Sequence, residues 1–254
     1  MTSSESASSW PAGPTAPVTD GSLIDRALRW NELFGTWPEE VRAQLAAQAR
    51  LRRYGRRTQV LAHDRQAREL LCVVSGCLEV GCVDAEGRKF VYGLMRPGHI
   101  APLVRLLEEA PLPYDYHAHE DSVILHLACE AVLEVLDSQP QLWREVARLA
   151  LQRQRFSLAC LHERVLGGIP QRLVVTLLRL AALYGNSEPE GLALRVRLSQ
   201  HDLAAILGVS RQTINREMGE LIAQGVLEAT YNRIVIKDLE RLQAMARALS
   251  TPVA

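Results

Sequence analysis

The chain has 254 residues, of which 48% are hydrophobic and 23% are charged, and its 29 lysines and arginines balance its 29 acids. This length allows one large domain or two ordinary ones, and the neutral balance excludes a strongly basic nucleic-acid coat protein and an acidic tail protein. No apolar run approaches the roughly 18 residues that span a bilayer. The first residues lack a secretory signal, and the odd number of cysteines suits a reducing compartment. We therefore predict a cytoplasmic protein with no membrane partner.

The N-terminal segment differs in composition from the rest of the chain. Residues 1–22 are mostly Ser, Thr, Pro, Ala and Gly, which bury too little apolar surface to offset the entropy of ordering. We predict a disordered tail there. Residues 31–35 and 38–50 then have the spacing of two short helices.

Residues 51–127 alternate short apolar runs with Gly, Pro and Asp. The runs 69–74, 77–83 and 89–95 have the length of strands, and 84–87 is a good hairpin turn. Short strands separated by turns at such intervals predict a small antiparallel barrel or sandwich.

From residue 130 the apolar period changes to between three and four, which predicts a helix of more than twenty residues. A narrow stripe on it contains residues that recur every three or four positions: Leu142, Val146, Leu149, Arg153, Phe156 and Cys160. We predict that this stripe is the seam of a homodimer, and packing on the chain's own barrel is the alternative. Residues 167–170, Gly-Gly-Ile-Pro, predict a hinge after it.

After a helix at 171–184 and a polar loop at 185–191, the sequence predicts two short helices joined by a tight turn. Ser199 and Asp202 form a capping-box pair at the start of the first helix, Gly208 suits the turn, and Ser210 suits the cap of the second. In the second helix one face is apolar and predicted to be buried: Ile214, Met218, Leu221 and Ile222.

The opposite face of this second helix carries Arg211, Gln212, Asn215 and Arg216, whose side chains suit base edges in a major groove. The pair therefore predicts a DNA-binding helix-turn-helix, with residues 225–227 and 232–236 as a two-stranded wing and Asn232 at its tip. An ordinary solvated helix face is the alternative. From Arg164 onward the chain has 11 basic and 8 acidic residues, so the predicted DNA-binding end is the basic one.

Residues 198–236, with the core L-S-Q-H-D-L-A-A-I-L-G-V-S-R-Q-T-I-N-R-E, resemble the winged helix-turn-helix of the Crp/Fnr transcription regulators. The resemblance extends back through the long helix to the S-G-C-L-E-V and R-P-G-H-I turns. It implies an α+β fold: a jelly-roll-like antiparallel β-roll of the cyclic-nucleotide-binding type (23–138), a dimerisation helix and hinge (139–168) and a winged helix-turn-helix (169–254). It further implies a homodimer on a palindromic promoter site that contacts RNA polymerase and is not an enzyme.

Carried over by position, the family's base-contacting residues fall on Arg211, Gln212 and Arg216, with Asn215 on the same face. Gln212 stands where many relatives have glutamate, and its amide prefers adenine. Three further residues at the helix N-termini are expected at the phosphates: Ser199, Gln200 and Ser210. Thr213 is also expected to contact DNA.

The sensor domain departs from the family pattern. The stretches 100–103 and 111–115 stand where relatives carry a ribose-binding glutamate and a phosphate-binding arginine. The effector is therefore predicted to be an unidentified small molecule and not cyclic AMP. The resemblance places its pocket at seven positions: Ile100, Ala101, Leu103, Tyr114, Tyr116, Ser157 and Leu158.

Two alternatives remain open for this domain. If residues 114–121 form one strand, His117 and His119 share a face with Asp115 and Asp121, which would suit a metal-binding sensor or β-barrel enzyme. Haem binding through a His or Cys belongs to the same alternative. The other is a cyclic-AMP receptor with an altered pocket.

Overall fold

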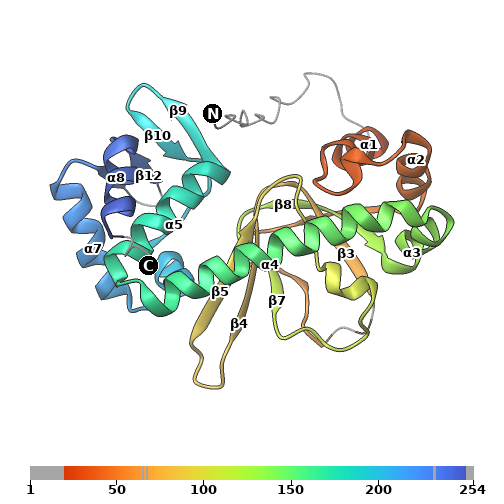
Figure 1. The fold of residues 1–254 in the computed structure, drawn as a ribbon, viewed down its shortest axis with the longest axis horizontal. Coiled ribbons are helices and arrows are strands. Elements are labelled where there is room, and N and C mark those ends of the chain that lie inside the picture. Colours follow the sequence, from red (N-terminus) through yellow and green to blue (C-terminus); the bar gives the residue numbers. More distant parts are fainter. Residues whose placement is uncertain (1–19, 65, 67, 231–232, 250–254) are drawn as a thin grey trace.

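The computed structural model describes residues 20–249 except 65, 67, 231 and 232. Two bodies of secondary structure are joined by one long helix, α4, which runs across the molecule (Figure 1). Residues 1–19 of the predicted tail lie outside the described residues. The last three residues of that tail, 20–22, are helical, so the predicted boundary at residue 22 is wrong. No helix in this part of the chain is both long and apolar enough to cross a membrane.

Two helices and a 3-10 turn precede the strands: α1 (Asp20–Trp30), η1 (Phe34–Thr36) and α2 (Glu39–Gln48). The sequence pattern did not predict α1, and the helix expected at 31–35 is this short turn. Buried Asn31 fixes the turn, because its Oδ1 accepts hydrogen bonds from the amides of Leu33 and Phe34 at 3.0 and 3.2 Å. Its Nδ2 donates to the Gly98 carbonyl at 3.1 Å, which ties the turn to the strands.

Eight strands form the predicted β-roll as two four-stranded antiparallel sheets. The first has the order β1-β8-β3-β6, with bounds Arg50–Tyr54, Ser122–Ala128, Glu69–Ser75 and Ile100–Ala101. The second has the order β2-β7-β4-β5, with bounds Gln59–Leu61, Asp115–Ala118, Leu78–Val83 and Lys89–Met95. The 3-10 turn η2 (Leu103–Leu106) follows β6. The strands expected at 69–74, 77–83 and 89–95 are confirmed.

The long helix begins after α3 (Cys129–Ser138) and the 3-10 turn η3 (Pro140–Leu142). Helix α4 spans Trp143–Leu166, and its 24 residues make it about 36 Å long. This confirms the predicted long helix.

The predicted dimer stripe requires a correction. Leu142, Val146 and Leu149 are buried in the core of the chain's own N-terminal domain, at 6–8% exposure. Arg153 is also engaged there, because it forms an ion pair with Glu32 at 2.5 Å and donates to the Ile100 carbonyl. These four residues therefore pack inward, and only Phe156 and Cys160 of the predicted stripe lie beyond that contact.

A second apolar stripe of α4 faces outward. Its four members are all more than half exposed: Leu151, Leu158, Leu161 and Val165. Their spacings of seven, three and four residues are those of a heptad seam, a signal that the sequence already carried.

The C-terminal domain begins with α5 (Ile169–Tyr184), whose first turn contains Pro170. The hinge is therefore the pair Gly167 and Gly168, and the proline belongs to the next helix, where its missing N–H costs nothing. Helices α6 (Gln200–Leu207), α7 (Arg211–Ala223) and α8 (Leu239–Leu249) follow.

A four-stranded sheet of order β11-β12-β10-β9 completes this domain. Its strands are Leu227–Thr230, Arg233–Ile236, Gly191–Leu194 and Gly185–Glu188. Strands β11 and β12 pair as a two-stranded wing, but the first strand overlaps the one predicted at 225–227 only at Leu227. Asn232, predicted at the tip, lies outside the described residues. The segment expected to be a polar loop at 185–191 instead pairs as the β9–β10 hairpin.

Candidate nucleic-acid interface

The two helices α6 and α7 are bounded by local hydrogen bonds that the sequence specifies. The Ser199 hydroxyl accepts from the Asp202 amide at 3.2 Å, and the Asp202 carboxylate accepts from the Ser199 amide at 2.8 Å, which completes a capping box. Gly208 ends α6 in the left-handed conformation with φ of 65°. The Ser210 hydroxyl accepts from the Thr213 amide at 3.1 Å and starts α7.

One face of α7 is anchored in the apolar core of the C-terminal domain. Ile214, Met218 and Leu221 are at most 4% exposed, as predicted. Ile222, also predicted to be buried, is 41% exposed, and Glu217 is buried instead. The reason is angular: at about 100° per residue, Ile222 lies roughly 80° around the helix from Ile214, whereas Glu217 lies roughly 60° away.

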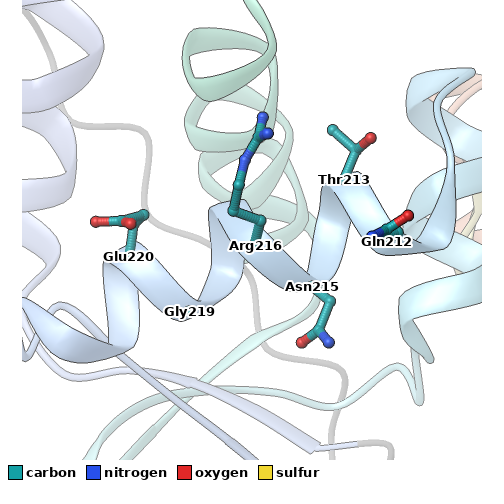
Figure 2. Close-up of a pocket in the computed structure, with 6 residues that line it drawn as sticks. All are labelled: Gln212, Thr213, Asn215, Arg216, Gly219 and Glu220. Atoms are coloured by element: carbon teal, nitrogen blue, oxygen red, sulfur yellow. The ribbon is translucent and has the colours of Figure 1, made fainter.

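The opposite face of α7 points to solvent. Arg211, Gln212, Asn215 and Arg216 are exposed. An open hollow on this face is lined by residues of α7 alone: Gln212, Thr213, Asn215, Arg216, Gly219 and Glu220. Figure 2 shows Thr213 and Arg216 projecting from one side of the helix and Asn215 from the other. Because the anchored face fixes the helix, these side chains are held outward as a set.

Two contacts restrain side chains on this face. The Arg216 guanidinium donates to Glu217 Oε1 from Nε at 3.1 Å and from Nη2 at 2.7 Å. Gln200, on α6, donates from Nε2 to Asn215 Oδ1 at 3.3 Å. The eight residues predicted to contact DNA therefore belong to one helix pair, which presents guanidinium forks and an amide of the kind that read base edges.

The predicted effector residues lie in the β-roll and on α4. Ile100 and Tyr116 are buried in two different apolar clusters of the β-roll, and Ala101 shares the cluster of Tyr116. Leu103 and Tyr114 are half-buried around them, whereas Ser157 and Leu158 lie on the exposed side of α4.

One buried cation of this region was not predicted from the sequence. Arg105, in η2, is only 1% exposed. Burial raises the pKa of Tyr114 and of Tyr116 above the ordinary value, and the Arg105 charge partly opposes this. A long charged side chain at the end of an apolar turn gives no local signal that it points inward.

The predicted face shared by His117 and His119 is wrong. The alternation of β7 ends at Ala118, so that His117 is half-buried on one side and His119 is buried beyond the strand end. His119 Nε2 lies 2.9 Å from the Arg197 carbonyl oxygen, and its Nδ1 lies 3.5 Å from Glu79 Oε2. Burial lowers the pKa of His119, but hydrogen bonds to Glu79 and to the Arg197 carbonyl outweigh it, so the pKa is raised above its ordinary value.

Two family models match the chain. Residues 171–245 match a Crp-like helix-turn-helix domain, and residues 51–139 match a cyclic nucleotide-binding domain.

Among similar curated proteins, the cyclic AMP receptor protein of Thermus thermophilus is 25% identical over 224 residues, which are 88% of this chain and 100% of the relative. The anaerobic regulatory protein of Bacillus subtilis is 25% identical over 178 residues, 69% of this chain and 74% of the relative.

Solved structures share the fold. A CooA mutant from Carboxydothermus hydrogenoformans gives a TM-score of 0.69 at 21% identity and covers 85% of this chain and 95% of that one. FixK2 from Bradyrhizobium japonicum gives a TM-score of 0.69 at 18% identity and covers 81% of this chain and 99% of that one.

Substitution by alanine is expected to have opposite effects on stability at Gly208, which ends α6, and at Gly219, which lies inside α7. Gly208→Ala places a Cβ at φ of 65° and is expected to lower the free energy of unfolding by about 1 kcal/mol. Gly219→Ala, inside α7 with no atom within 4 Å of the added Cβ, is expected to raise it by roughly 0.5–1 kcal/mol. Urea unfolding of both variants measures the signs, and equal signs would contradict the assigned turn.

Proposed function

Because the chain belongs to the Crp/Fnr family of transcription regulators, we propose that it binds a specific palindromic promoter site as a homodimer and acts there on RNA polymerase in the cytoplasm. The observation that carries the proposal is the outward face of α7. Its opposite face is buried, so Arg211, Gln212, Asn215 and Arg216 are the side chains available to a major groove.

The proposed readout divides these side chains by chemistry. Arg211 and Arg216 donate to guanine O6 and N7 or to a phosphate, and Gln212 pairs with adenine. Arg216 must exchange its contact with Glu217 for the one with DNA. The Arg216 side chain is 69% exposed but that of Glu217 is only 11% exposed, so the exchange leaves a largely buried carboxylate without this guanidinium.

The phosphate contacts are proposed at the starts of α6 and α7. The hydroxyls of Ser199 and Ser210 already accept backbone hydrogen bonds, so what they present to a phosphate is the positive end of a capped helix. Gln200 and Thr213 stand beside these caps and complete the set.

The proposed homodimer forms through the outward stripe of α4. Leu151, Leu158, Leu161 and Val165 are 56–71% exposed in the single chain, an unusual amount of water-exposed apolar surface on one helix edge. A symmetry-related copy of α4 would cover it as a two-stranded coiled coil and would present two copies of α7 to half-sites about 34 Å apart.

The effector is proposed to be a small molecule other than cyclic AMP. The stretches 100–103 and 111–115 replace the glutamate and arginine that the family uses for ribose and phosphate, and Ile100 and Ala101 are buried in apolar clusters.

Arg211→Ala is expected to weaken binding to the specific site by roughly 1–3 kcal/mol and to relax preference at one base pair. The site is first selected from a random duplex library, and affinity is measured by fluorescence anisotropy on that site and on random duplex. Arg29→Ala, which removes the same charge from exposed α1, is the control and should change neither affinity. An equal loss on specific and random duplexes would refute base readout by Arg211.

The two stripes of α4 predict different effects for two variants, one with a single leucine substitution and one with two. Leu149→Ala should lower the free energy of unfolding by about 2–5 kcal/mol, because the side chain is buried in the chain's own core. Leu151→Ala and Leu158→Ala together should leave secondary structure intact and raise the dimer dissociation constant at least tenfold. Analytical ultracentrifugation measures this, and an undiminished dimer would place the seam elsewhere.

Isothermal titration of the full chain with cyclic AMP is expected to give no saturable heat up to millimolar nucleotide. A sample that binds its selected duplex serves as the folded control. Saturable binding at micromolar concentration would contradict this proposal and would assign cyclic-AMP recognition to this domain.

A further inference from the structure

The β-roll and the helix-turn-helix meet at a small polar contact. The end of β7 and the start of α6 approach each other there, and His119 contacts the Arg197 carbonyl oxygen at 2.9 Å. The neighbouring Glu120 accepts a hydrogen bond from the Arg197 amide at 2.7 Å. The two domains are therefore held in a defined position at this point.

Three potential metal ligands converge inside this contact. Glu79 of β4, His119 after β7 and Asp202 of α6 each offer one donor atom, and these atoms lie within 4.8 Å of one another. The side chains of Glu79 and His119 are only 5% exposed, and Asp202 is half-buried. The set is unlike the acidic clusters of protein surfaces, because it is enclosed and includes an imidazole.

The orientation of His119 follows from its neighbours. A carbonyl oxygen only accepts hydrogen bonds, so Nε2 must carry a proton and donate it to Arg197. Nδ1 is then the nitrogen that faces the Glu79 carboxylate, at 3.5 Å. A metal-bound histidine commonly has this arrangement, with its second N–H held by a backbone carbonyl.

We propose that Glu79, His119 and Asp202 bind one divalent transition-metal ion, which links the β-roll to the helix-turn-helix. Imidazole nitrogen and carboxylate oxygens are ligands that suit zinc and its neighbours. In tetrahedral geometry, bonds of about 2.0–2.2 Å place two donors on one ion roughly 3.3–3.6 Å apart. The donor atoms now lie within 4.8 Å of one another, so the widest pair must approach by about 1.2–1.5 Å, which requires side-chain rotation.

Each carboxylate can accommodate the ion. Asp202 uses Oδ2 for the Ser199 amide at 2.8 Å, which leaves Oδ1 for the metal. Glu79 contacts the Lys89 ammonium through Oε1 at 2.7 Å and Oε2 at 2.8 Å. Lys89 is one-third exposed, so it can withdraw toward water when a divalent cation replaces it. Lys89 is thus a competitor of the metal.

Zinc and cobalt titrations of the chelator-treated full chain test this site. We expect one ion per chain in equilibrium dialysis, together with visible absorption of bound Co²⁺ and a higher unfolding temperature with Zn²⁺. Because binding is measured without DNA, its failure would leave the proposed promoter function standing.

Four variants distinguish Zn²⁺ binding at this site from Zn²⁺ binding at surface histidines. Glu79→Gln and His119→Gln should each weaken Zn²⁺ binding at least tenfold. Asp202→Asn, which keeps an oxygen for the Ser199 amide, should do the same. Lys89→Gln should tighten binding, because it removes the competing cation.

The matched control is His117→Gln, two residues from His119 and only half-buried, which should bind Zn²⁺ like the parent chain. The proposal is overturned if the parent chain binds no ion or if any of the three ligand variants retains full affinity. It is also overturned if His117→Gln alone abolishes binding.

Discussion

Helix α4 is fixed at both ends, and this constraint sets how the two domains face each other. Its first half is anchored by Val146 and Leu149 in the N-terminal core and by the ion pair of Arg153 with Glu32. At its far end Arg164 donates to the Ile206 carbonyl at 2.6 Å and lies 4.1 Å from the centre of the Phe90 ring. The helix thus transmits the position of the β-roll to the start of the DNA-binding domain.

The two stripes of α4 explain what periodicity could and could not predict. The inward stripe has spacings of three or four residues and the outward stripe has spacings of seven, three and four, all of which fit a helix. The sequence therefore establishes the helix but not which stripe faces the chain's own core. Which stripe is buried depends on partners distant in sequence. Arg153, for example, reaches Glu32 and the Ile100 carbonyl only when its side chain faces the N-terminal domain. The outward leucines were recognisable by their heptad spacing only once the inward stripe had been assigned.

The helix-turn-helix was predictable because its signals are local. The caps at Ser199 and Ser210 and the left-handed Gly208 each depend on residues within four positions. The cluster of Glu79, His119 and Asp202 was not predictable, since its members are 40 or more residues apart. Glu79 and His119 meet through the pairing of β4 with β7, and Asp202 joins them only through domain docking. The expected His117 and His119 pair failed for a simpler reason: it required β7 to continue past Ala118, and the strand ends there.

The chemistry of the interdomain contact determines the free energy needed to separate the two domains. Its apolar part is small and includes Cys77 and Leu94 of the β-roll against the C-terminal core. The rest consists of hydrogen bonds, such as those of His119 and Glu120 with Arg197, each of which contributes only about 0.5–1.5 kcal/mol net because water replaces it. Separating the domains therefore costs far less than unfolding either one, and the glycines between α4 and α5 allow the movement. An ion or ligand that binds only across this contact would stabilise the docked arrangement by mass action, with the core that positions α7 unchanged.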